Sequence, residues 1–165
     1  KSIQNLFQRI IVKKEYIKSP AINLVHLDTV DKNKRLDATI NQIGDYLKED
    51  RKVCCVFNNI EKMSEMQRSI NSKISEKIKI GTFYSDSKGD CTNNILSGKF
   101  GDYDVVLVTN YFLNGINITN DGLTNEEIKA GKTSTQKYGV VIDLGSEYAR
   151  INAMDTIQTV NRFRN

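Results

Sequence analysis

Two arginines near the end of the sequence, Arg162 and Arg164, carry side chains well suited to binding phosphate. They follow Gln158 in the segment 155–165 (DTIQTVNRFRN). A guanidinium group stays charged at neutral pH, and its fixed fork of N–H donors matches the oxygens of a phosphate group. The alternative is a basic helix end that the helix dipole stabilises without any ligand.

A second group of polar residues follows the apolar run 104–109 (DVVLVT), which reads as a buried strand. Thr109 ends this run, Asn110 comes next, and a turn with Gly115 and Asn117 follows. A hydroxyl group at a strand end can bond the phosphate backbone of a nucleic acid without reading its bases. A glycine there can adopt a positive φ or let a ligand approach the backbone closely. The plainer interpretation is a buried strand and a turn with no ligand.

Polar residues also follow two other apolar runs. Asn58 and Asn59 come after 52–57 (KVCCVF), and Ser85 comes after 78–84. Asn58 and Ser85 are therefore candidates for phosphate contacts at strand ends. Because asparagine is a favoured N-cap residue, we expect the asparagine pair to cap the next helix rather than to bind a ligand.

The elements that must position these residues alternate between strand and helix patterns. Apolar runs and helical spacing predict strands at 21–27, 52–57, 78–84, 104–109 and 139–144, and helices at 33–49, 60–74, 90–98 and 154–164. This alternation predicts an α/β fold, with a parallel sheet of about five or six strands and helices on both faces. Such sheets bind ligands at the carboxyl ends of their strands, where the polar residues above are found.

Two details of packing can also be predicted. Cys54 and Cys55 are adjacent in a buried strand, so one should face each side of the sheet as a small hydrophobe. In the helix at 90–98, Ile95 and Leu96 should point inward.

The composition is that of an ordinary soluble domain: 165 residues, of which 39% are hydrophobic and 27% charged. No apolar run approaches the ~20 residues needed to cross a bilayer, so we expect no membrane partner. A net charge of +4 is compatible with a polyphosphate partner. The three cysteines and the single histidine form no familiar zinc pattern, so we predict no metal site and a reducing, cytoplasmic setting.

The order of these segments resembles motifs IV, V and VI of the C-terminal RecA-like motor domain of superfamily 2 helicases and translocases. Residues 52–69 resemble motif IV, in which a strand ends in a Phe-x-Asn type turn and a helix follows. Thr109 and Gly115 match the threonine and glycine of motif V. Asn117 stands where that motif usually has aspartate, so it keeps an acceptor and lacks the charge.

The end of the sequence is similar to motif VI, usually Gln-x-x-Gly-Arg-x-x-Arg. Gln158 and Arg162 match, Asn161 replaces the glycine, and Arg164 comes one position before the second arginine of the motif. The resemblance implies a RecA-like fold over 21–165, truncated at its C-terminal end. It implies a catalytic role for Arg162 and Arg164. It implies nucleotide binding by Gly115, Asn117 and Gln158, and nucleic-acid binding by Thr109, Asn110, Asn58 and Ser85.

The resemblance further implies ATP and Mg²⁺ as ligands of the full-length protein and DNA or RNA as its partner. The sequence contains neither a P-loop nor an Asp-Glu-x-Asp/His box. We therefore expect residues 1–20 to lead in from a preceding N-terminal RecA-like domain of the same chain. We also expect this fragment alone to be inactive in ATP hydrolysis. A helicase and a duplex translocase look alike in this half of the motor.

The polar stretch 119–138 is longer than this fold needs, and we interpret it as an inserted surface loop or helical turn. Within it, 130–133 (AGKT) imitates the end of a P-loop, but Glu126 stands where the first glycine is required. Two other classes remain open. One is a non-catalytic α/β module that binds nucleic acid or protein; the other is a flavodoxin-like or receiver domain, for which the loop 28–31 lacks the acidic cluster or flavin-binding pattern.

Overall fold

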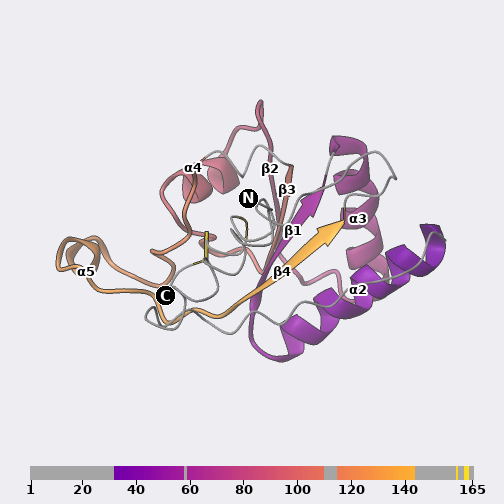
Figure 1. The fold of residues 1–165 in the computed structure, drawn as a ribbon, viewed down its shortest axis with the longest axis horizontal. Helices are drawn as coiled ribbons and strands as arrows, with labels where there is room; N and C mark the ends of the chain where they lie inside the picture. Colours follow the sequence, from indigo (N-terminus) through magenta and orange to yellow (C-terminus); the bar gives the residue numbers. More distant parts are fainter. Residues whose placement is uncertain (1–31, 58, 110–114, 144–158, 160–161, 164–165) are drawn as a thin grey trace, which may run out of the picture.

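The computed structural model describes residues 32–57, 59–109, 115–143, 159 and 162–163 (Figure 1). The expected strand at 21–27 lies outside these residues. Helices and strands alternate, in chain order α2 (Lys32–Lys48), β1 (Lys52–Phe57), α3 (Ile60–Lys73), β2 (Ile80–Phe83), α4 (Asp90–Leu96), β3 (Val105–Thr109), α5 (Asn125–Lys129) and β4 (Tyr138–Asp143). Within the described ranges, no helix has the length and apolar character needed to cross a membrane.

The strands of the described part form one parallel sheet of four strands, in the order β2-β3-β1-β4. β1 lies between β3 and β4, and its register with β3 runs from Val53↔Val105 to Phe57↔Thr109. The predicted α/β class and the parallel sheet are therefore confirmed. The sheet has four strands in this part of the chain, against the five or six expected for the whole.

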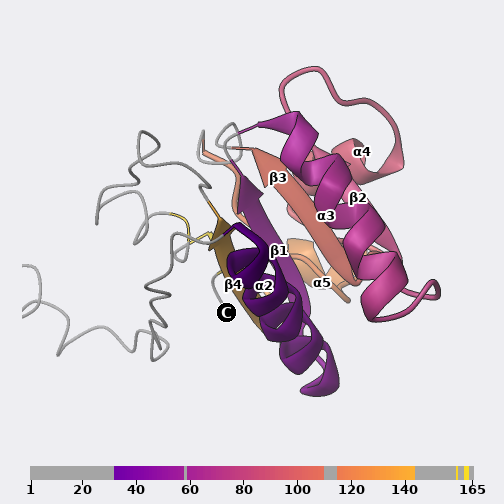
Figure 2. The ribbon, with the colours of Figure 1, turned by 90° about the vertical axis from the view of Figure 1, so that its right-hand side faces the viewer.

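Helices α2 and α3 cover one face of the sheet (Figure 2). Alternate residues of β1, among them Cys55, point into this layer, whereas Cys54 points to the opposite face. The prediction that the two cysteines face different sides is confirmed. Both side chains are fully buried, and burial raises the pKa of Cys54 well above its ordinary value.

Helix α4 covers the other face together with Phe100, Ile118 and Phe163. Ile95 is fully buried there, as predicted. The expectation that Leu96 also points inward is wrong, because its side chain is 63% exposed. Successive helix residues are rotated by about 100°, so Leu96 points away from the sheet when Ile95 faces it.

The chain leaves the neighbouring strands β1 and β3 toward opposite faces of the sheet. After β1 it forms α3 on the α2 face, and after β3 it reaches Ile116 and Ile118, which pack on the α4 face. In open parallel sheets, a reversal of this kind marks the ligand-binding place at the carboxyl ends of the two strands. The fold therefore points to the ends of β1 and β3, which are paired at Phe57 and Thr109.

Gly139 lies in β4 where the strand passes beneath Tyr46 of α2. It is buried, and a Cβ atom added there would overlap the tyrosine ring. We expect Gly139→Ala to lower the free energy of unfolding by about 1–3 kcal/mol, the usual effect of overpacking a core. Urea unfolding of the variant and the wild type measures the difference.

Gly44→Ala is the matched control, because Gly44 lies inside α2 and an added Cβ would be 3.8 Å from Ile74. That change should raise the free energy of unfolding by about 0.5–1 kcal/mol, since alanine favours the helix. A Gly139→Ala protein as stable as the wild type would contradict the close packing of α2 on β4.

Candidate functional site

Thr109 and Ser85 lie at the carboxyl edge of the sheet, where the sequence predicts nucleic-acid contacts. Thr109 is half-buried as the last residue of β3. Ser85 is exposed in the turn after β2, and its hydroxyl group donates to the Asp86 carboxylate at 3.3 Å. The other two candidates, Asn58 and Asn110, lie outside the described residues.

Helix α3 begins directly after β1, and its first turn carries both Glu61 and Lys62. Asn59 is the N-cap, and its Oδ1 accepts the backbone N–H of Lys62 at 2.9 Å, so the predicted capping role is confirmed for this asparagine. The Nζ atom of Lys62 is buried and has no hydrogen-bond partner within the part of the chain that the structure describes. The positive end of the α3 helix dipole lies next to the end of β1 and favours negative charge there.

Gly115 begins the described part of the segment that follows β3. Its φ is +91°, and an added Cβ would meet no atom within 4 Å. The backbone conformation, rather than crowding, therefore requires glycine at this position. This agrees with the positive φ that the sequence suggests for it.

The structure brings together Asn117 and Arg162, which are 45 residues apart in the sequence. Nη1 of Arg162 donates to Oδ1 of Asn117 at 3.4 Å, at the surface of the molecule. The backbones also pair: the N–H of Ile118 donates to the carbonyl of Arg162 at 2.7 Å, and Ile118 forms a parallel bridge with Phe163. Ile118 and Phe163 both belong to the apolar cluster on the α4 face, so this pairing lies on that face of the sheet.

Phe163 fixes the position of this segment against the α4 face. It is buried, with its ring centroid 5.9 Å from that of Phe100 and 5.1 Å from that of Tyr138. The sequence analysis missed this role. The available signal was an aromatic residue between two arginines, which suits a segment that turns one side inward and the other outward.

Asp121 is a buried carboxylate that joins the start of the insert to the core. Its Oδ1 accepts the backbone N–H groups of Phe100 at 2.9 Å and Gly101 at 3.0 Å. Oδ1 also lies 3.5 Å from Nζ of Lys52, and Oδ2 accepts the hydroxyl group of Tyr138 at 2.8 Å. Burial, and then the nearby charge of Asp121, raises the pKa of Tyr138 far above its ordinary value.

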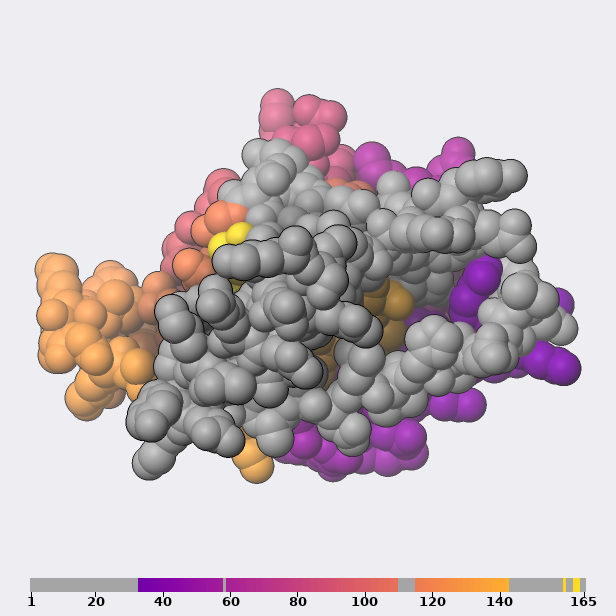
Figure 3. Space-filling model, viewed as in Figure 1, coloured from indigo at the N-terminus to yellow at the C-terminus, as the bar shows by residue number. Residues whose placement is uncertain are grey.

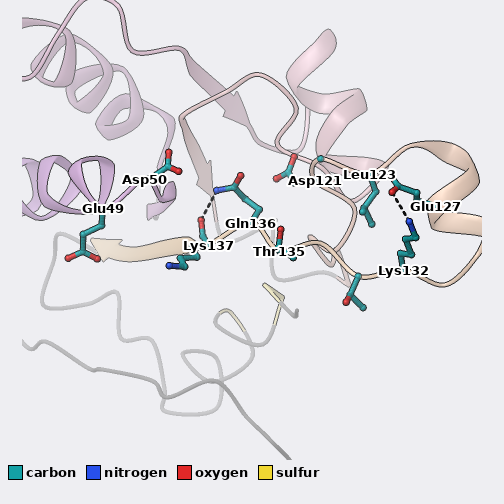
Figure 4. Close-up of a pocket in the computed structure, with 11 residues that line it drawn as sticks. Glu49, Asp50, Asp121, Leu123, Glu127, Lys132, Thr135, Gln136 and Lys137 are labelled. Atoms are coloured by element: carbon teal, nitrogen blue, oxygen red, sulfur yellow. Dashed lines mark hydrogen bonds and ion pairs between the residues drawn. The ribbon is translucent and has the colours of Figure 1, made fainter.

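A cavity of about 570 Å³ lies at the opposite end of the sheet from the predicted site (Figure 4). The turn before β1, with Glu49 and Asp50, forms one side of it, and the insert forms the other. Its charges include a Lys132–Glu127 ion pair at 3.0 Å, shown dashed in Figure 4. The charged residues that line the cavity are four acidic and two basic, so acidic side chains are in excess there: Glu49, Asp50, Asp121 and Glu127 against Lys132 and Lys137.

The insert 119–138 projects from one end of the molecule, in orange in Figure 3. Its short helix α5 begins with a capping box between Thr124 and Glu127. The segment 130–133 (AGKT) therefore follows a helix, whereas a P-loop must follow a buried strand. The segment therefore lacks the strand–loop–helix context in which a P-loop is found.

The remaining predicted residues, Arg164 and Gln158, lie outside the described residues. In the described part of the chain, no three histidine, cysteine, aspartate or glutamate side chains gather as a metal site would require. No profile of a known protein family matches this sequence, and no curated protein matches it. The choice of function therefore depends on these residues and their geometry.

Proposed function

We propose that this chain is the C-terminal RecA-like motor domain of an ATP-dependent nucleic-acid helicase or translocase of superfamily 2. The observation that carries the proposal is the pairing of 117–118 with 162–163, through the Arg162–Asn117 hydrogen bond and the Ile118–Phe163 bridge. These residues belong to the segments that resemble motifs V and VI. A motor domain of this class needs both segments side by side so that an arginine can reach the nucleotide.

In this proposal, Arg162 and Arg164 are arginine fingers, and Gly115, Asn117 and Gln158 lie near the nucleotide. The N-terminal RecA-like domain of the same protein binds the ATP. A guanidinium group then stabilises the negative charge that develops on the transferred phosphoryl group. Mg²⁺, when bound, would neutralise charge on the phosphate oxygens. The described residues offer that ion no acidic cluster, so carboxylates of the other domain would hold it.

The carboxyl edge of the sheet is the proposed nucleic-acid surface, with Thr109, Asn110, Asn58 and Ser85 as contacts. The reversal between β1 and β3 supports this location. Hydroxyl and amide groups bond phosphate oxygens without reading bases, so binding should depend little on the nucleotide sequence. DNA and RNA both offer such a backbone.

The proposal is tested by comparing this segment alone with the motor that includes the N-terminal RecA-like domain. We expect the full motor to hydrolyse ATP faster when DNA or RNA is added. The segment alone should release phosphate no faster than buffer, because the proposed ATP site needs both domains.

Turnover by the segment alone that disappears with Arg162→Ala would contradict the proposal. A full motor that binds nucleic acid without hydrolysing ATP would also contradict it. The second result would favour the non-catalytic binding module.

A further inference from the structure

We propose that Asp86 limits the strength of nucleic-acid binding at the carboxyl edge of the sheet. The inference rests on the proposed function, in which Ser85 contacts a phosphate of the strand. Its starting point is the turn after β2, where Ser85 and Asp86 are both exposed and the Ser85 hydroxyl group donates to the Asp86 carboxylate at 3.3 Å. A fixed negative charge therefore lies at a place to which the strand would bring its own.

Ser87 fixes the turn that carries Asp86. Its Oγ atom donates to the carbonyl of Tyr84 at 2.8 Å and accepts the N–H of the same residue at 3.0 Å. The hydroxyl group of Thr92, in α4, also donates to this oxygen at 3.0 Å, so the one donor and both acceptor positions of Ser87 are used. The backbone closes the turn with a hydrogen bond from the N–H of Ser87 to the Tyr84 carbonyl at 3.1 Å. Asp86 lies inside this closed turn, so its backbone has a defined place.

The turn lies beside the end of β3. Strands β2 and β3 are parallel neighbours, and Phe83 pairs with Val108, one residue before Thr109. Neighbouring strands lie ~4.8 Å apart, and exposed charges interact over about 10 Å at 0.1 M salt. A nucleic-acid strand bound to Ser85 beside Thr109 would therefore come within range of the Asp86 carboxylate.

The carboxylate of Asp86 forms no ion pair in the described part of the chain, and its interaction there is the hydrogen bond from Ser85. Other exposed acids differ in this respect, since Asp37 is paired with Lys73. An unpaired carboxylate repels phosphate groups, and it also occupies the single proton that the Ser85 hydroxyl group could donate to them. Asp86 thus weakens the grip of this edge, which suits a motor that must release its track at each step.

The test measures the strand affinity of the full motor carrying Asp86→Asn, which removes the charge and keeps an acceptor for the Ser85 hydroxyl group. Fluorescence anisotropy of a labelled single-stranded oligonucleotide, as DNA and as RNA, gives the dissociation constant. At ~0.05 M salt the variant should bind roughly two- to fivefold more tightly than wild type, the range for one interaction between exposed charges. Salt screens such charges, so the gain should shrink when both proteins are measured near ~0.5 M salt.

Glu76→Gln is the matched control, because Glu76 is exposed in the turn that precedes β2, at the opposite end of that strand, and loses the same unit of charge. It should leave the affinity nearly unchanged. Equal gains in the two variants would show a general effect of net charge and overturn the inference. An Asp86→Asn motor that binds like wild type would also overturn it, and so would a gain that salt does not reduce.

Failure of this inference can be told apart from failure of the proposed function. A wild-type motor that binds neither DNA nor RNA would overturn the proposed function. A motor that binds a strand and hydrolyses ATP, but whose affinity does not depend on Asp86, would overturn only the inference about this residue.

Discussion

Arg162→Ala in the full motor should lower kcat for ATP hydrolysis by a factor of roughly 10³ to 10⁵ and leave the affinity for a nucleic-acid strand nearly unchanged. The loss falls on kcat because the guanidinium group acts on charge that develops in the transition state. Strand binding should survive because Arg162 is not one of the proposed strand contacts, which include Thr109 at the end of β3. Phosphate release at saturating ATP and fluorescence anisotropy of a labelled strand measure the two quantities.

Two further variants test whether the effect depends on the guanidinium group of Arg162. Arg162→Lys should recover little activity, since an ammonium group lacks the fixed fork of donors. Arg68→Ala removes an exposed arginine of α3 and should leave kcat unchanged. If Arg162→Ala weakened strand binding as much as turnover, its role would be structural or in strand binding, and the assignment as an arginine finger would fail.

Asp121→Ala should produce the largest loss of stability, about 3–5 kcal/mol, the usual effect of removing one partner from a buried ion pair. The change leaves the N–H groups of Phe100 and Gly101, the Tyr138 hydroxyl group and the Lys52 ammonium group without their common acceptor. Unfolding in urea, followed by circular dichroism, measures the difference.

Tyr138→Phe is a smaller perturbation of the hydrogen bonds around Asp121. It removes one hydrogen bond and keeps the ring that packs on Phe163, so the loss should be about 1 kcal/mol. Asp102→Ala is the matched control, because the Asp102 side chain is 91% exposed and its ion pair with Lys79 is at the surface. It should not change stability measurably. If Asp102→Ala and Asp121→Ala lowered the free energy of unfolding by similar amounts, the buried contacts of Asp121 would not contribute to stability as expected.

The elements of this fold could be predicted because their signals are local. The apolar run around Cys54 and Cys55 and the helical spacing after Asn59 depend on neighbours a few residues away. The capping role of Asn59 is also local, since its partner is three residues further along the chain. The prediction that Leu96 points inward was wrong because apolar type alone does not reveal which side of a short helix faces the sheet.

The candidate site could be predicted only in part. Asn117 and Arg162 could be named from their chemical types and from the motifs they resemble, but their contact spans 45 residues and appears only in the fold. The buried structural role of Asp121 could not be predicted because its partners are between 17 and 69 residues away in the sequence. A buried carboxylate of this kind looks, in the sequence, like the first residue of an ordinary Asp-Gly turn.

The burial of the cysteines has a practical consequence. All three, Cys54, Cys55 and Cys91, are free and buried, and burial raises the pKa of Cys91 to about 11. Thiolate is the nucleophile that attacks maleimide dyes, so these buried thiols should react poorly in the native protein. A cysteine introduced at the exposed position Asn125, the first residue of α5, would then be the preferred attachment point for a fluorophore.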